Sequence, residues 1–576
     1  MKPAVYLETF GCQMNELDSQ LVTGSLRALG YTFTPDADAA SVVLYNTCSV
    51  RELAEQKVWS RLGELAVRKH QQPDLVVGVL GCMAEREGPA LMKRMPVVDL
   101  MVGPGELDKL PGLLDNAVRT RASMTVDADR LETEAPAERP KLVSTNQSAL
   151  QGNTNRRSTT LAAAADTLEL LDLSRAVSPD DHTGSAYVRI TRGCNKFCTY
   201  CVVPFTRGAE VHRPPQHIID ECKKLADAGV IEITLLGQTV NHYRFEHGAA
   251  VTLGGVIQPQ KGRVYKSAAG EGENGHRDAY TGANVTTFAD LLHQIHEQVP
   301  AIKRLRFVTS YPKSFGDDVL SVIRNSPRIC RYLHVPAQSG SDRILGLMNR
   351  GYTVGEYLDF IDRARAFLHQ PEIGRPLTLA GDIIVGFPTE TEDDYAATVA
   401  LLRRVRYKNC FIFKYSPRPG TTAIDRFDDD VPADIKRRRN NDLLAIQNAI
   451  SAEVGAEFVG QTLDVFVQGL SKRETKKRRD PKPSGIVLTV GGRSLEDNDD
   501  SQGACSSDGC GTHVTITDTE TVTSGPIQLS ARTEGDLIVF FDLPPGRNAD
   551  DLIGSIVPVK IDSSAPLSLH GRVVDR

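Results

Sequence analysis

The chain lacks the features of exported and membrane-bound proteins. Its 576 residues contain no apolar run near the about 18 residues of a membrane span, and the amino terminus MKPAVYLETFGC has no apolar secretory core. Cysteine is scarce as well: 11 residues in a chain without an export signal favour reduced thiols or metal ligands over disulfides. We therefore expect a soluble, cytoplasmic protein.

An excess of charge of one sign is also missing. The chain carries 67 Lys and Arg residues against 73 Asp and Glu residues, a formal net charge of −6. This balance gives no global indication of a nucleic-acid partner, so an electrostatic binding face would have to be a local patch. The length and a hydrophobic content of 40% are enough for about three to four packed domains.

One short segment, Arg192–Arg207, carries three closely spaced cysteines. It reads RGCNKFCTYCVVPFTR, with Cys194, Cys198 and Cys201 in the spacing CxxxCxxC. Three thiolates can bind three irons of a [4Fe–4S] cluster and leave the fourth iron open, whereas structural zinc needs four ligands and no fourth Cys or His follows immediately. With Tyr200 before the last cysteine, the motif resembles that of the radical S-adenosylmethionine (SAM) superfamily, whose open iron holds the amino acid part of SAM.

Residues 3–119 are predicted to form an α/β domain with a mainly parallel sheet, because short β-branched runs alternate with amphipathic stretches. The expected strands are Ala4–Thr9, Ser41–Asn46, Leu75–Leu80 and Val97–Val102, and the expected helices are Glu16–Leu29, Arg51–Lys69 and Ala84–Met95. The first three strands each end at a cysteine, namely Cys12, Cys48 and Cys82. Since the carboxyl ends of parallel strands share one edge, where ligands bind, we expect a second three-thiolate site there. The competing interpretation is three separate buried thiols.

A second run of βα alternation predicts a partial (β/α)6 barrel at residues 182–433. The expected strands are Ala186–Thr191, Glu232–Leu236, Arg304–Thr309, Arg331–Val335, Leu379–Val385 and Phe411–Tyr415, and the helices between them include Pro215–Ala228, Phe288–Val299, Tyr357–Leu368 and Asp393–Val405. The Cys194 loop follows the first strand, where barrel enzymes place their chemistry. Residues 120–181 are expected to be a linker or insertion with one candidate helix at Leu161–Leu173, and residues 244–284 a surface insertion.

The carboxyl-terminal part is predicted to be a helical connector at residues 434–459 and a small antiparallel β-barrel at residues 460–576. Short alternating segments such as TLDVFVQG and LIVFFDLP recur there, and the arrangement resembles the TRAM domain, an RNA-binding barrel. Ser471–Lys482 has seven basic and two acidic residues and is expected to be a flexible loop that can bind phosphates. A further insertion is expected at about 483–515.

Five motifs together resemble the methylthiotransferase family, and within it the MiaB branch. They are TFGCQMNELDS (Thr9–Ser19), NTCSVRELAEQKV (Asn46–Val58), GCMAERE (Gly81–Glu87), GCNKFCTYCVVPFTRG (Gly193–Gly208) and HVPAQSGSDRIL (His334–Leu345). The resemblance covers nearly the whole chain apart from the three insertions. It implies an enzyme that converts N6-isopentenyladenosine at position 37 of tRNA, next to the anticodon, into its 2-methylthio derivative.

The resemblance also implies two clusters. The CxxxCxxC thiolates would carry the [4Fe–4S] cluster that cleaves SAM to a 5′-deoxyadenosyl radical. Cys12, Cys48 and Cys82 would carry an auxiliary [4Fe–4S] cluster that holds the sulfur to be delivered, and a second SAM would supply the methyl group.

Four positions at strand ends resemble the SAM-binding elements of the superfamily: Gly237 and Gln238 in LLGQTVN, and Asp382 and Gly386 in GDIIVGFPTE. The implied partners are a tRNA whose anticodon stem-loop bears isopentenyladenosine, and an electron donor such as flavodoxin or ferredoxin. We expect a monomer without membrane attachment.

Three other interpretations remain open. The first is a methylthiotransferase of another branch, acting on threonylcarbamoyladenosine in tRNA or on an aspartate of a ribosomal protein, although VVPFTRG after the third cluster cysteine favours the MiaB branch. The second is an RNA-binding protein with purely structural metal. The third is a ferredoxin-type electron carrier, which needs four thiolates per cluster and no large barrel.

Overall fold

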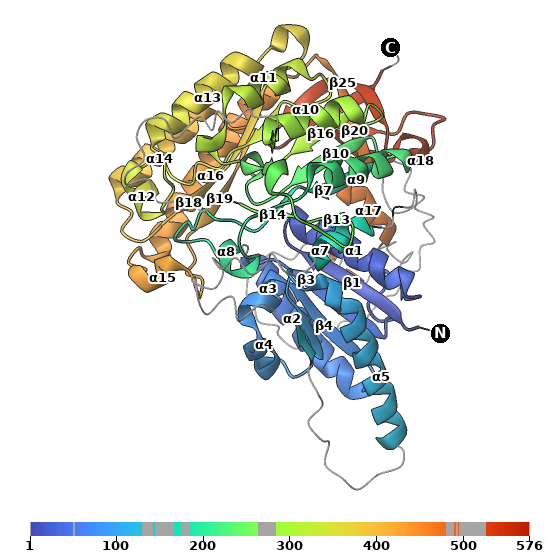
Figure 1. Ribbon diagram of the computed structural model, residues 1–576. Coiled ribbons are helices and arrows are strands. Elements are labelled where there is room, and N and C mark those ends of the chain that lie inside the picture. Colours follow the sequence, from blue (N-terminus) through green and yellow to red (C-terminus); the bar gives the residue numbers. More distant parts are fainter. Residues whose placement is uncertain are drawn as a thin grey trace.

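The computed structural model describes residues 2–49, 52–128, 142–144, 166–175, 177, 184–262, 284–479, 489–490, 493–494 and 526–574. The amino-terminal sheet (blue in Figure 1) lies at one end of the molecule, the barrel and its helices (green to orange) occupy the centre, and the carboxyl-terminal strands (red) lie away from the amino-terminal sheet. Within the ranges given, no helix is long and apolar enough to cross a membrane.

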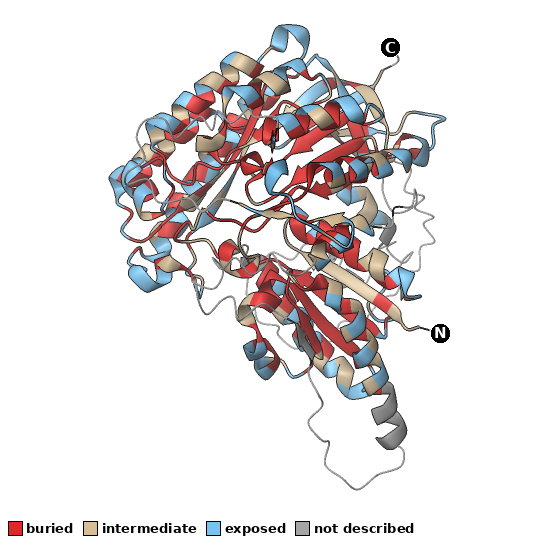
Figure 2. Ribbon diagram, in the orientation of Figure 1, coloured by how far each residue is buried: buried red, intermediate tan, exposed pale blue. Residues whose placement is uncertain are grey.

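The amino-terminal part is built on a six-stranded sheet in the order β2-β1-β3-β4-β5-β6, with every pairing parallel. The strands are β1 (Ala4–Phe10), β2 (Thr32–Phe33), β3 (Val42–Thr47), β4 (Val76–Gly81), β5 (Leu100–Val102) and β6 (Leu142–Ser144). The helices are α1 (Gln13–Ala28), α2 (Glu52–Gln71), α3 (Cys82–Glu87), α4 (Pro89–Arg94), η1 (Leu107–Lys109) and α5 (Leu110–Ala128). Because β3 and β4 are buried along their whole length and two hydrophobic clusters flank them, both faces of the sheet are covered (Figure 2).

Most of the predicted elements of this part are present. All four predicted strands occur, the last of them shortened to Leu100–Val102, and the first two predicted helices occur as well. The predicted continuous helix Ala84–Met95 is wrong, because Gly88, with φ of 53°, separates α3 from α4 just before Pro89. The sequence did not predict α5, which runs across the expected boundary at residue 119.

The central part forms the predicted incomplete barrel of six parallel strands. Its sheets β7-β10-β16 and β17-β18-β19 are joined by a parallel bridge between Leu305 and Ile329. The strands are β7 (Ser185–Arg189), β10 (Glu232–Leu236), β16 (Arg304–Phe307), β17 (Tyr332–His334), β18 (Thr378–Val385) and β19 (Asn409–Lys414). The helices are α8 (Val203–Thr206), α9 (Pro215–Asp227), η5 (Val240–His242), α10 (Phe288–Gln298), η7 (Pro312–Ser314), α11 (Asp317–Asn325), α12 (Asp342–Leu347), α13 (Val354–Leu368), η8 (Pro371–Ile373), α14 (Glu392–Val405) and α15 (Thr422–Arg426). Among the strands described, no pairing joins β7 to β19, so the ring is open on that side.

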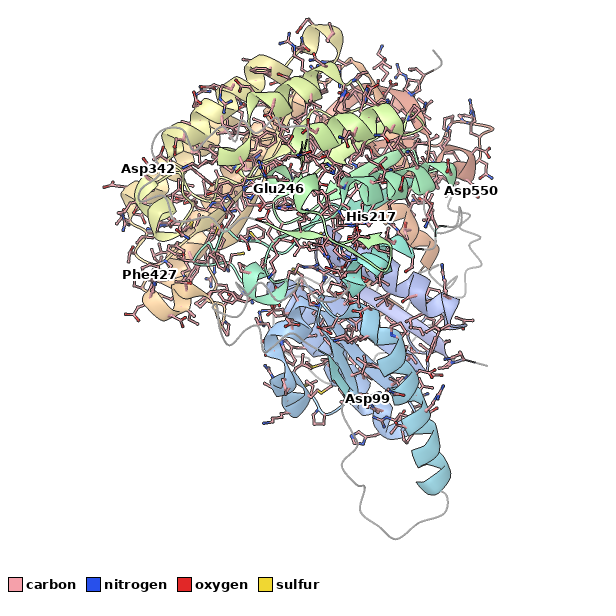
Figure 3. The ribbon with its side chains drawn as sticks, in the orientation of Figure 1. Asp99, His217, Glu246, Asp342, Phe427 and Asp550 are labelled. Carbon is pink, nitrogen blue, oxygen red and sulfur yellow. The ribbon has the colours of Figure 1, made fainter. Side chains whose placement is uncertain are left out.

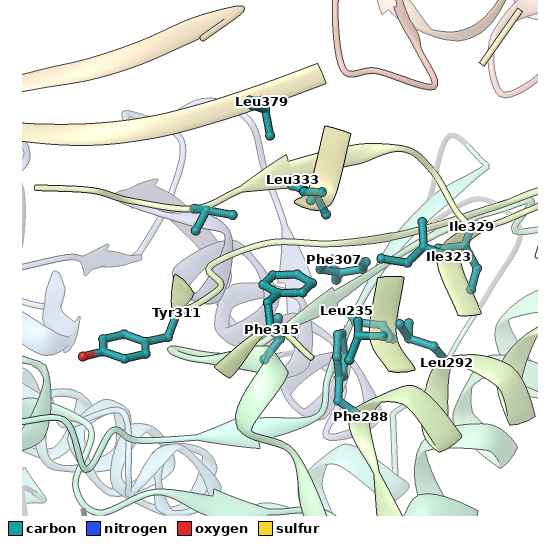
Figure 4. Close-up of a cluster of buried hydrophobic side chains, with 14 of the residues drawn as sticks. Leu235, Phe288, Leu292, Phe307, Tyr311, Phe315, Ile323, Ile329, Leu333 and Leu379 are labelled. Carbon is teal, nitrogen blue, oxygen red and sulfur yellow. The ribbon is translucent and has the colours of Figure 1, made fainter. Parts of the chain in front are cut away.

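One hydrophobic core fills the wall of the barrel. It joins residues of both three-stranded sheets, such as Leu235 and Leu379, to the surrounding helices (Figure 4). Phe288 and Phe307 pack edge to face with ring centroids 5.2 Å apart. The six strands are therefore held in place by packing although the ring is not closed.

Two segments expected to be irregular contain regular elements. In the expected linker the helix α7 (Thr167–Leu173) confirms part of the candidate helix, and residues 129–141 and 145–165 lie outside the described ranges. The expected surface insertion contains the following elements: β11 (Arg244–Glu246), η6 (His247–Ala249), β12 (Thr252–Leu253), β13 (Val256–Ile257), β14 (Gln260–Lys261) and β15 (Val285–Thr287). The expected surface position is confirmed for most of residues 244–262, which are exposed or half-buried, but the segment is not irregular: Phe245 is buried in the barrel core, and β14 pairs with β9 (Val211–His212), itself paired with β8 (Thr191–Arg192). Residues 263–283 are outside the described ranges.

The carboxyl-terminal part is a small closed barrel behind a long helix. The helix α16 (Ala433–Ala456) confirms the predicted connector helix, and the barrel strands follow the order β20-β23-β24-β26-β25. Its elements are β20 (Thr462–Leu470), α17 (Lys472–Arg479), β21 (Thr489–Val490), β22 (Arg493–Ser494), β23 (Gln528–Thr533), β24 (Ile538–Asp542), α18 (Ala549–Leu552), β25 (Ile556–Ala565) and β26 (Ser568–Val573). The prediction of a wholly antiparallel barrel is wrong in one pairing, because β24 and β26 pair in parallel.

The basic segment Ser471–Lys482 differs from its prediction. Instead of a loop, residues 472–479 form α17, whose first turn is capped by the Ser471 side chain, which accepts a hydrogen bond from the Glu474 backbone. Long charged side chains have good helix propensity, and the sequence SKRE carries the capping pattern. The insertion expected at 483–515 lies outside the described residues except for β21 and β22.

The turn between β23 and β24 lies against the starts of the strands of the central barrel. There Glu232, at the start of β10, accepts from Arg306 at 2.9 Å and from Arg532 at 2.8 Å, and Asp536 pairs with Lys408 at 2.8 Å. Glu232 is fully buried. The small barrel is therefore docked to the strand starts through buried charges, at the end opposite to the strand-end loops.

Candidate active site between two cysteine groups

The three strand-end cysteines gather at the carboxyl edge of the amino-terminal sheet. Cys12 precedes the first turn of α1, Cys48 follows β3 and Cys82 opens α3. A Cβ added to Gly11 would lie 2.8 Å from the Cβ of Cys48, so glycine is needed for these loops to approach each other. Cys12 and Cys48 form a hydrogen bond, and the charge of Cys12 acts on Cys82. The structure thus brings the three predicted cysteines together.

The acidity of these thiols is uneven. The hydrogen bond with Cys48, together with the positive charge of Arg207, lowers the pKa of Cys12 to about 6 against the opposing effect of burial. Burial raises the pKa of Cys82. Cys12 is consequently a thiolate at neutral pH, the form in which cysteine binds metals.

The second cysteine group lies on the loop that follows β8. Gly193 adopts φ of +71° and passes so close to the Ala209 carbonyl oxygen that a Cβ would lie 2.1 Å from it. Burial, with added effects from neighbouring charges that include Cys198, raises the pKa of Cys194 to about 12 and also raises that of Cys201. The charges of these cysteines affect one another's pKa, so the three predicted cysteines of this loop also lie close together.

Buried polar side chains surround Cys194. Among the described residues, neither carboxylate oxygen of Glu210 has a hydrogen-bond partner, and the same holds for Oε1 of Gln238. The nearest imidazole nitrogen, Nδ1 of His242, is 3.5 Å from Glu210, and burial lowers the pKa of the nearby Lys196 to about 7. Buried polar groups are nearly always hydrogen-bonded in folded proteins, so this set indicates a polar ligand. Sequence reasoning had selected only Gln238 from it.

Arg207 connects the two cysteine groups. It ends α8, just after the CxxxCxxC motif, and its guanidinium donates to Asp18 of α1 at 2.7 Å and hydrogen-bonds to Cys82. Arg189 of β7 donates to the other carboxylate oxygen of Asp18 at 3.3 Å. The side chains of this trio are 6% exposed or less. Arg207 therefore joins the segment that follows the CxxxCxxC motif to the strand-end cysteine group, at a buried interface between the amino-terminal sheet and the barrel.

The helix α7 supplies further buried carboxylates to this region. Glu169 accepts from Nε of Arg213 at 2.9 Å and lies 3.0 Å from Nδ1 of His217, which Figure 3 labels. Asp172 accepts three hydrogen bonds from Arg189, at 2.7, 2.9 and 3.2 Å. Although burial acts to raise it, the charge of Arg213 brings the pKa of Glu169 down to about 2. The expected linker thus neutralises arginines at the base of the candidate site.

The four residues predicted to bind SAM fall into two kinds. Gly237 and Gly386 have local packing reasons, because a Cβ on either would lie 2.1 and 2.3 Å, respectively, from a neighbouring side chain. Gln238 has the buried amide oxygen described above. Asp382 lies on β18 with a partly exposed side chain, 3.4 Å from Nε2 of His334.

The donor set fits iron–sulfur clusters better than a single metal ion. Within the described part of the chain, no three His, Cys, Asp or Glu side chains are placed to hold one metal ion. A [4Fe–4S] cluster does not require this, because each thiolate binds a different iron. The nine described cysteines are free thiols, and six of them form the two groups of three. Each group provides three thiols, as a cluster with one open iron requires.

Comparison with known proteins identifies the family. Residues 4–103, which include the strand-end cysteines, match the family described as uncharacterized protein family UPF0004, and residues 188–402, which include the CxxxCxxC motif, match the Radical SAM superfamily. The chain is 38% identical to the tRNA-2-methylthio-N(6)-dimethylallyladenosine synthase of Rhodopirellula baltica over 86% of this chain and 89% of that protein. The synthase of the same name from Akkermansia muciniphila is 33% identical over 99% of this chain and 98% of that protein. The chain belongs to the tRNA-2-methylthio-N(6)-dimethylallyladenosine synthase family.

Membership of the radical SAM superfamily implies a [4Fe–4S] cluster and SAM as cofactors, as the CxxxCxxC motif had predicted. A solved structure of the radical S-adenosylmethionine methyltransferase TsrM from Kitasatospora setae is 14% identical, with a TM-score of 0.44, over 73% of this chain and 77% of that one.

Proposed function

We propose that the protein is a radical SAM methylthiotransferase that adds a methylthio group to carbon 2 of N6-isopentenyladenosine at position 37 of tRNA. Family membership supplies the reaction class. The observation that carries the proposal is the buried contact of Arg207 with Asp18 and Cys82, which ties the segment after the CxxxCxxC motif to the strand-end cysteine group. A reaction that both opens a C–H bond and inserts sulfur needs two such sites side by side.

In this proposal each cysteine group holds one [4Fe–4S] cluster. Cys194, Cys198 and Cys201 would hold the cluster that binds SAM, and the strand-end cysteines would hold the auxiliary cluster. When bound, these groups supply radical cleavage of an unactivated C–H bond and a sulfur atom, chemistry that amino acid side chains do not provide. The chain contributes burial, which keeps water away from the thiols, and the fixed interface between the two groups.

The buried polar groups near Cys194 would orient SAM. Glu210 and Lys196 carry groups of opposite charge, which suit the ammonium and carboxylate of an amino acid. Gln238 offers an amide oxygen that accepts hydrogen bonds. These residues would fix the amino acid end of SAM before the RNA enters.

The RNA base would enter along the open side of the barrel. On β19, Cys410 and Ile412 pack into the core with the helices, so Phe411 and Phe413 face the other way, beside Asp382 and Ile384 of β18 in the strand register. The two rings are stacked at 19° with centroids 6.4 Å apart and are 45% and 37% exposed. Unpaired RNA bases stack on such aromatic faces. We assign this pair to contacts with the anticodon loop.

The remaining partners follow from a tRNA substrate. The basic helix α17 on the small barrel would contact phosphates without reading sequence. Reduction of a cluster requires an electron donor such as flavodoxin or ferredoxin. We propose a monomer that works in the cytoplasm, where tRNA is modified.

The deciding experiment is an anaerobic assay of the full-length chain, reconstituted with iron and sulfide, with SAM, reductant and isopentenylated tRNA, read by nucleoside mass spectrometry. The expected product is the 2-methylthio nucleoside, from a protein with about eight irons. Cys194→Ala should abolish SAM cleavage and product, whereas Cys48→Ala should keep some SAM cleavage and lose the product. Cys222→Ala is the matched control, since Cys222 is buried on α9 outside both groups.

Each variant can contradict the proposal separately. Methylthiolated nucleoside from Cys194→Ala or from Cys48→Ala would overturn the assignment of that cysteine group. Methylthiolation of threonylcarbamoyladenosine, with isopentenyladenosine left unchanged, would place the protein in another branch of the methylthiotransferases. A colourless protein that retains zinc would instead favour a purely structural metal.

A further inference from the structure

One buried arginine of the barrel contacts a sulfur of the CxxxCxxC motif. Arg350 lies between α12 and α13 and is 7% exposed. Its Nη1 donates to Sγ of Cys198 at 3.4 Å, its Nε donates to the Tyr352 hydroxyl at 2.9 Å, and its Nη2 donates to the Pro336 carbonyl at 3.1 Å. The guanidinium is thus fixed by three different acceptors, one of which is a proposed cluster ligand.

The charge of Arg350 is not balanced by a carboxylate. Among its described contacts there is no Asp or Glu, whereas the buried guanidiniums of Arg189, Arg213 and Arg306 each pair with two or more carboxylates. The rings of Tyr311 and Tyr352 lie 5.0 and 5.1 Å from it, but such contacts are worth only about 0.5–2 kcal/mol. An arginine keeps its proton in proteins, and a buried charge without a counter-charge is costly.

The missing negative charge is expected from the cysteines themselves. The ionisable groups around Arg350 are Cys198, Tyr200, Tyr311 and Tyr352, and burial raises the pKa of these tyrosines and so opposes their ionisation. Only thiolates bound to a metal centre would be negative in such surroundings at neutral pH. The cation therefore has its counter-charge when the cysteine group is loaded.

We propose that Arg350 is the charge-compensating residue of the SAM-binding cluster and raises its reduction potential. The proposal rests on the proposed function, in that Cys198 must be a cluster ligand. One-electron reduction by the external donor adds a negative charge to the cluster, and a cation that donates a hydrogen bond to a ligand sulfur stabilises that reduced state. Hydrogen bonds to the sulfurs and local charge are the protein's means of setting such potentials.

The other cysteine group provides an internal contrast. Arg207 also hydrogen-bonds to a cysteine, Cys82, but Asp18 already neutralises its charge at 2.7 Å. A neutral pair has a weaker effect on a nearby redox centre than an uncompensated cation. We therefore expect removal of Arg350 to shift its cluster more than removal of Arg207 shifts the auxiliary one.

The test is a redox titration of the reconstituted full-length chain, followed by electron paramagnetic resonance. The parent carries Cys12→Ala, Cys48→Ala and Cys82→Ala, so that only the SAM-binding cluster gives a signal. We expect Arg350→Met to lower the ratio of reduced to oxidised cluster at a fixed potential about tenfold, equivalent to about 59 mV for one electron. Arg350→Lys keeps the positive charge but loses the planar guanidinium with its several N–H donors. This variant should shift the reduction potential less than Arg350→Met.

The control is Arg343→Met, which removes an arginine of α12 that is about half exposed and pairs with Asp394 instead of a cysteine. It should leave the potential unchanged. An unshifted potential in Arg350→Met with about four irons bound would overturn the proposal. If that variant does not load iron, Arg350→Gln decides, because it removes the charge and keeps an N–H donor: loaded and unshifted, it overturns the proposal as well. A parent without iron would refute the proposed function instead.

Discussion

The buried ion pair between Asp18 of α1 and Arg207, next to the CxxxCxxC motif, can be tested by one nearly isosteric change, Asp18→Asn. Asp18 accepts hydrogen bonds from Arg207 at 2.7 Å and from Arg189 at 3.3 Å, and its side chain is fully buried. The substitution keeps the shape of the side chain and removes its charge. It leaves two guanidiniums at the interface with one carboxylate fewer.

The size of the effect follows from what each arginine retains. Arg189 keeps Asp172, to which it donates at 2.7, 2.9 and 3.2 Å. Arg207 loses the one carboxylate among its described contacts. Breaking a buried ion pair by removing one partner costs about 3–5 kcal/mol, and since asparagine still accepts a hydrogen bond we expect the lower end, about 3 kcal/mol. With a urea dependence of about 1–3 kcal/mol per M, the unfolding midpoint should fall by about 1–3 M.

The chain has a suitable reporter for this measurement. Trp59 on α2 is its one tryptophan, so intrinsic fluorescence follows the amino-terminal part through the urea transition. Glu64→Gln on the same helix is the control, because its pair with Arg61 is exposed and worth less than about 1 kcal/mol. Adding Arg207→Met to Asp18→Asn should restore part of the loss by removing the unpaired cation. Equal midpoints for Asp18→Asn and Glu64→Gln would refute the described interface.

Two further predictions concern the RNA contact and the docked barrel. Phe413→Ala should weaken binding of an isopentenylated anticodon stem-loop by about 1–3 kcal/mol, measured by fluorescence anisotropy, with Phe413→Trp restoring it; unchanged affinity in the alanine variant would remove the stacking role. Burial acts to raise the pKa of Asp536, but the charges of Lys408 and Arg532 bring it down to about 2. Its contribution to stability is therefore complete above the unfolded value of about 3.9 and is lost as the pH falls towards about 2, so thermal unfolding of the cluster-free chain should lose this acid dependence in Asp536→Asn.

Local patterns were sufficient to predict most of the fold. All six barrel strands were predicted within a few residues, because buried parallel strands are short apolar runs between helical periods. The errors arose where a local signal was passed over. The pair Gly88–Pro89 indicates the break between α3 and α4. Ser471 together with Glu474 indicates the start of α17. The strands β23 and β26 were missed, since QLSART and SLHGRV contain fewer β-branched and aromatic residues than β20.

The candidate site was predictable only as far as it lies on strand ends. Cys194, Cys198 and Cys201 could be grouped from their spacing, and Cys12, Cys48 and Cys82 because parallel strands align their carboxyl ends. Arg207 and Asp18, by contrast, are 189 residues apart and meet only through domain packing. The sequence gives no indication of a role for Arg350 either, since an arginine in a loop is normally solvated. Its burial beside Cys198 is a property of the folded barrel.

The docking of the small barrel fixes its distance from the strand-end loops of the central barrel. Five charged side chains hold the turn after β23 against the strand starts, namely Arg306, Glu232, Arg532, Asp536 and Lys408. An RNA bound by the small barrel would therefore lie at a fixed distance from the strand-end loops. In such an arrangement the distance between the RNA-binding surface of the small barrel and the reactive centre selects the nucleotide that is modified. Other bases of the RNA would not need to be recognised.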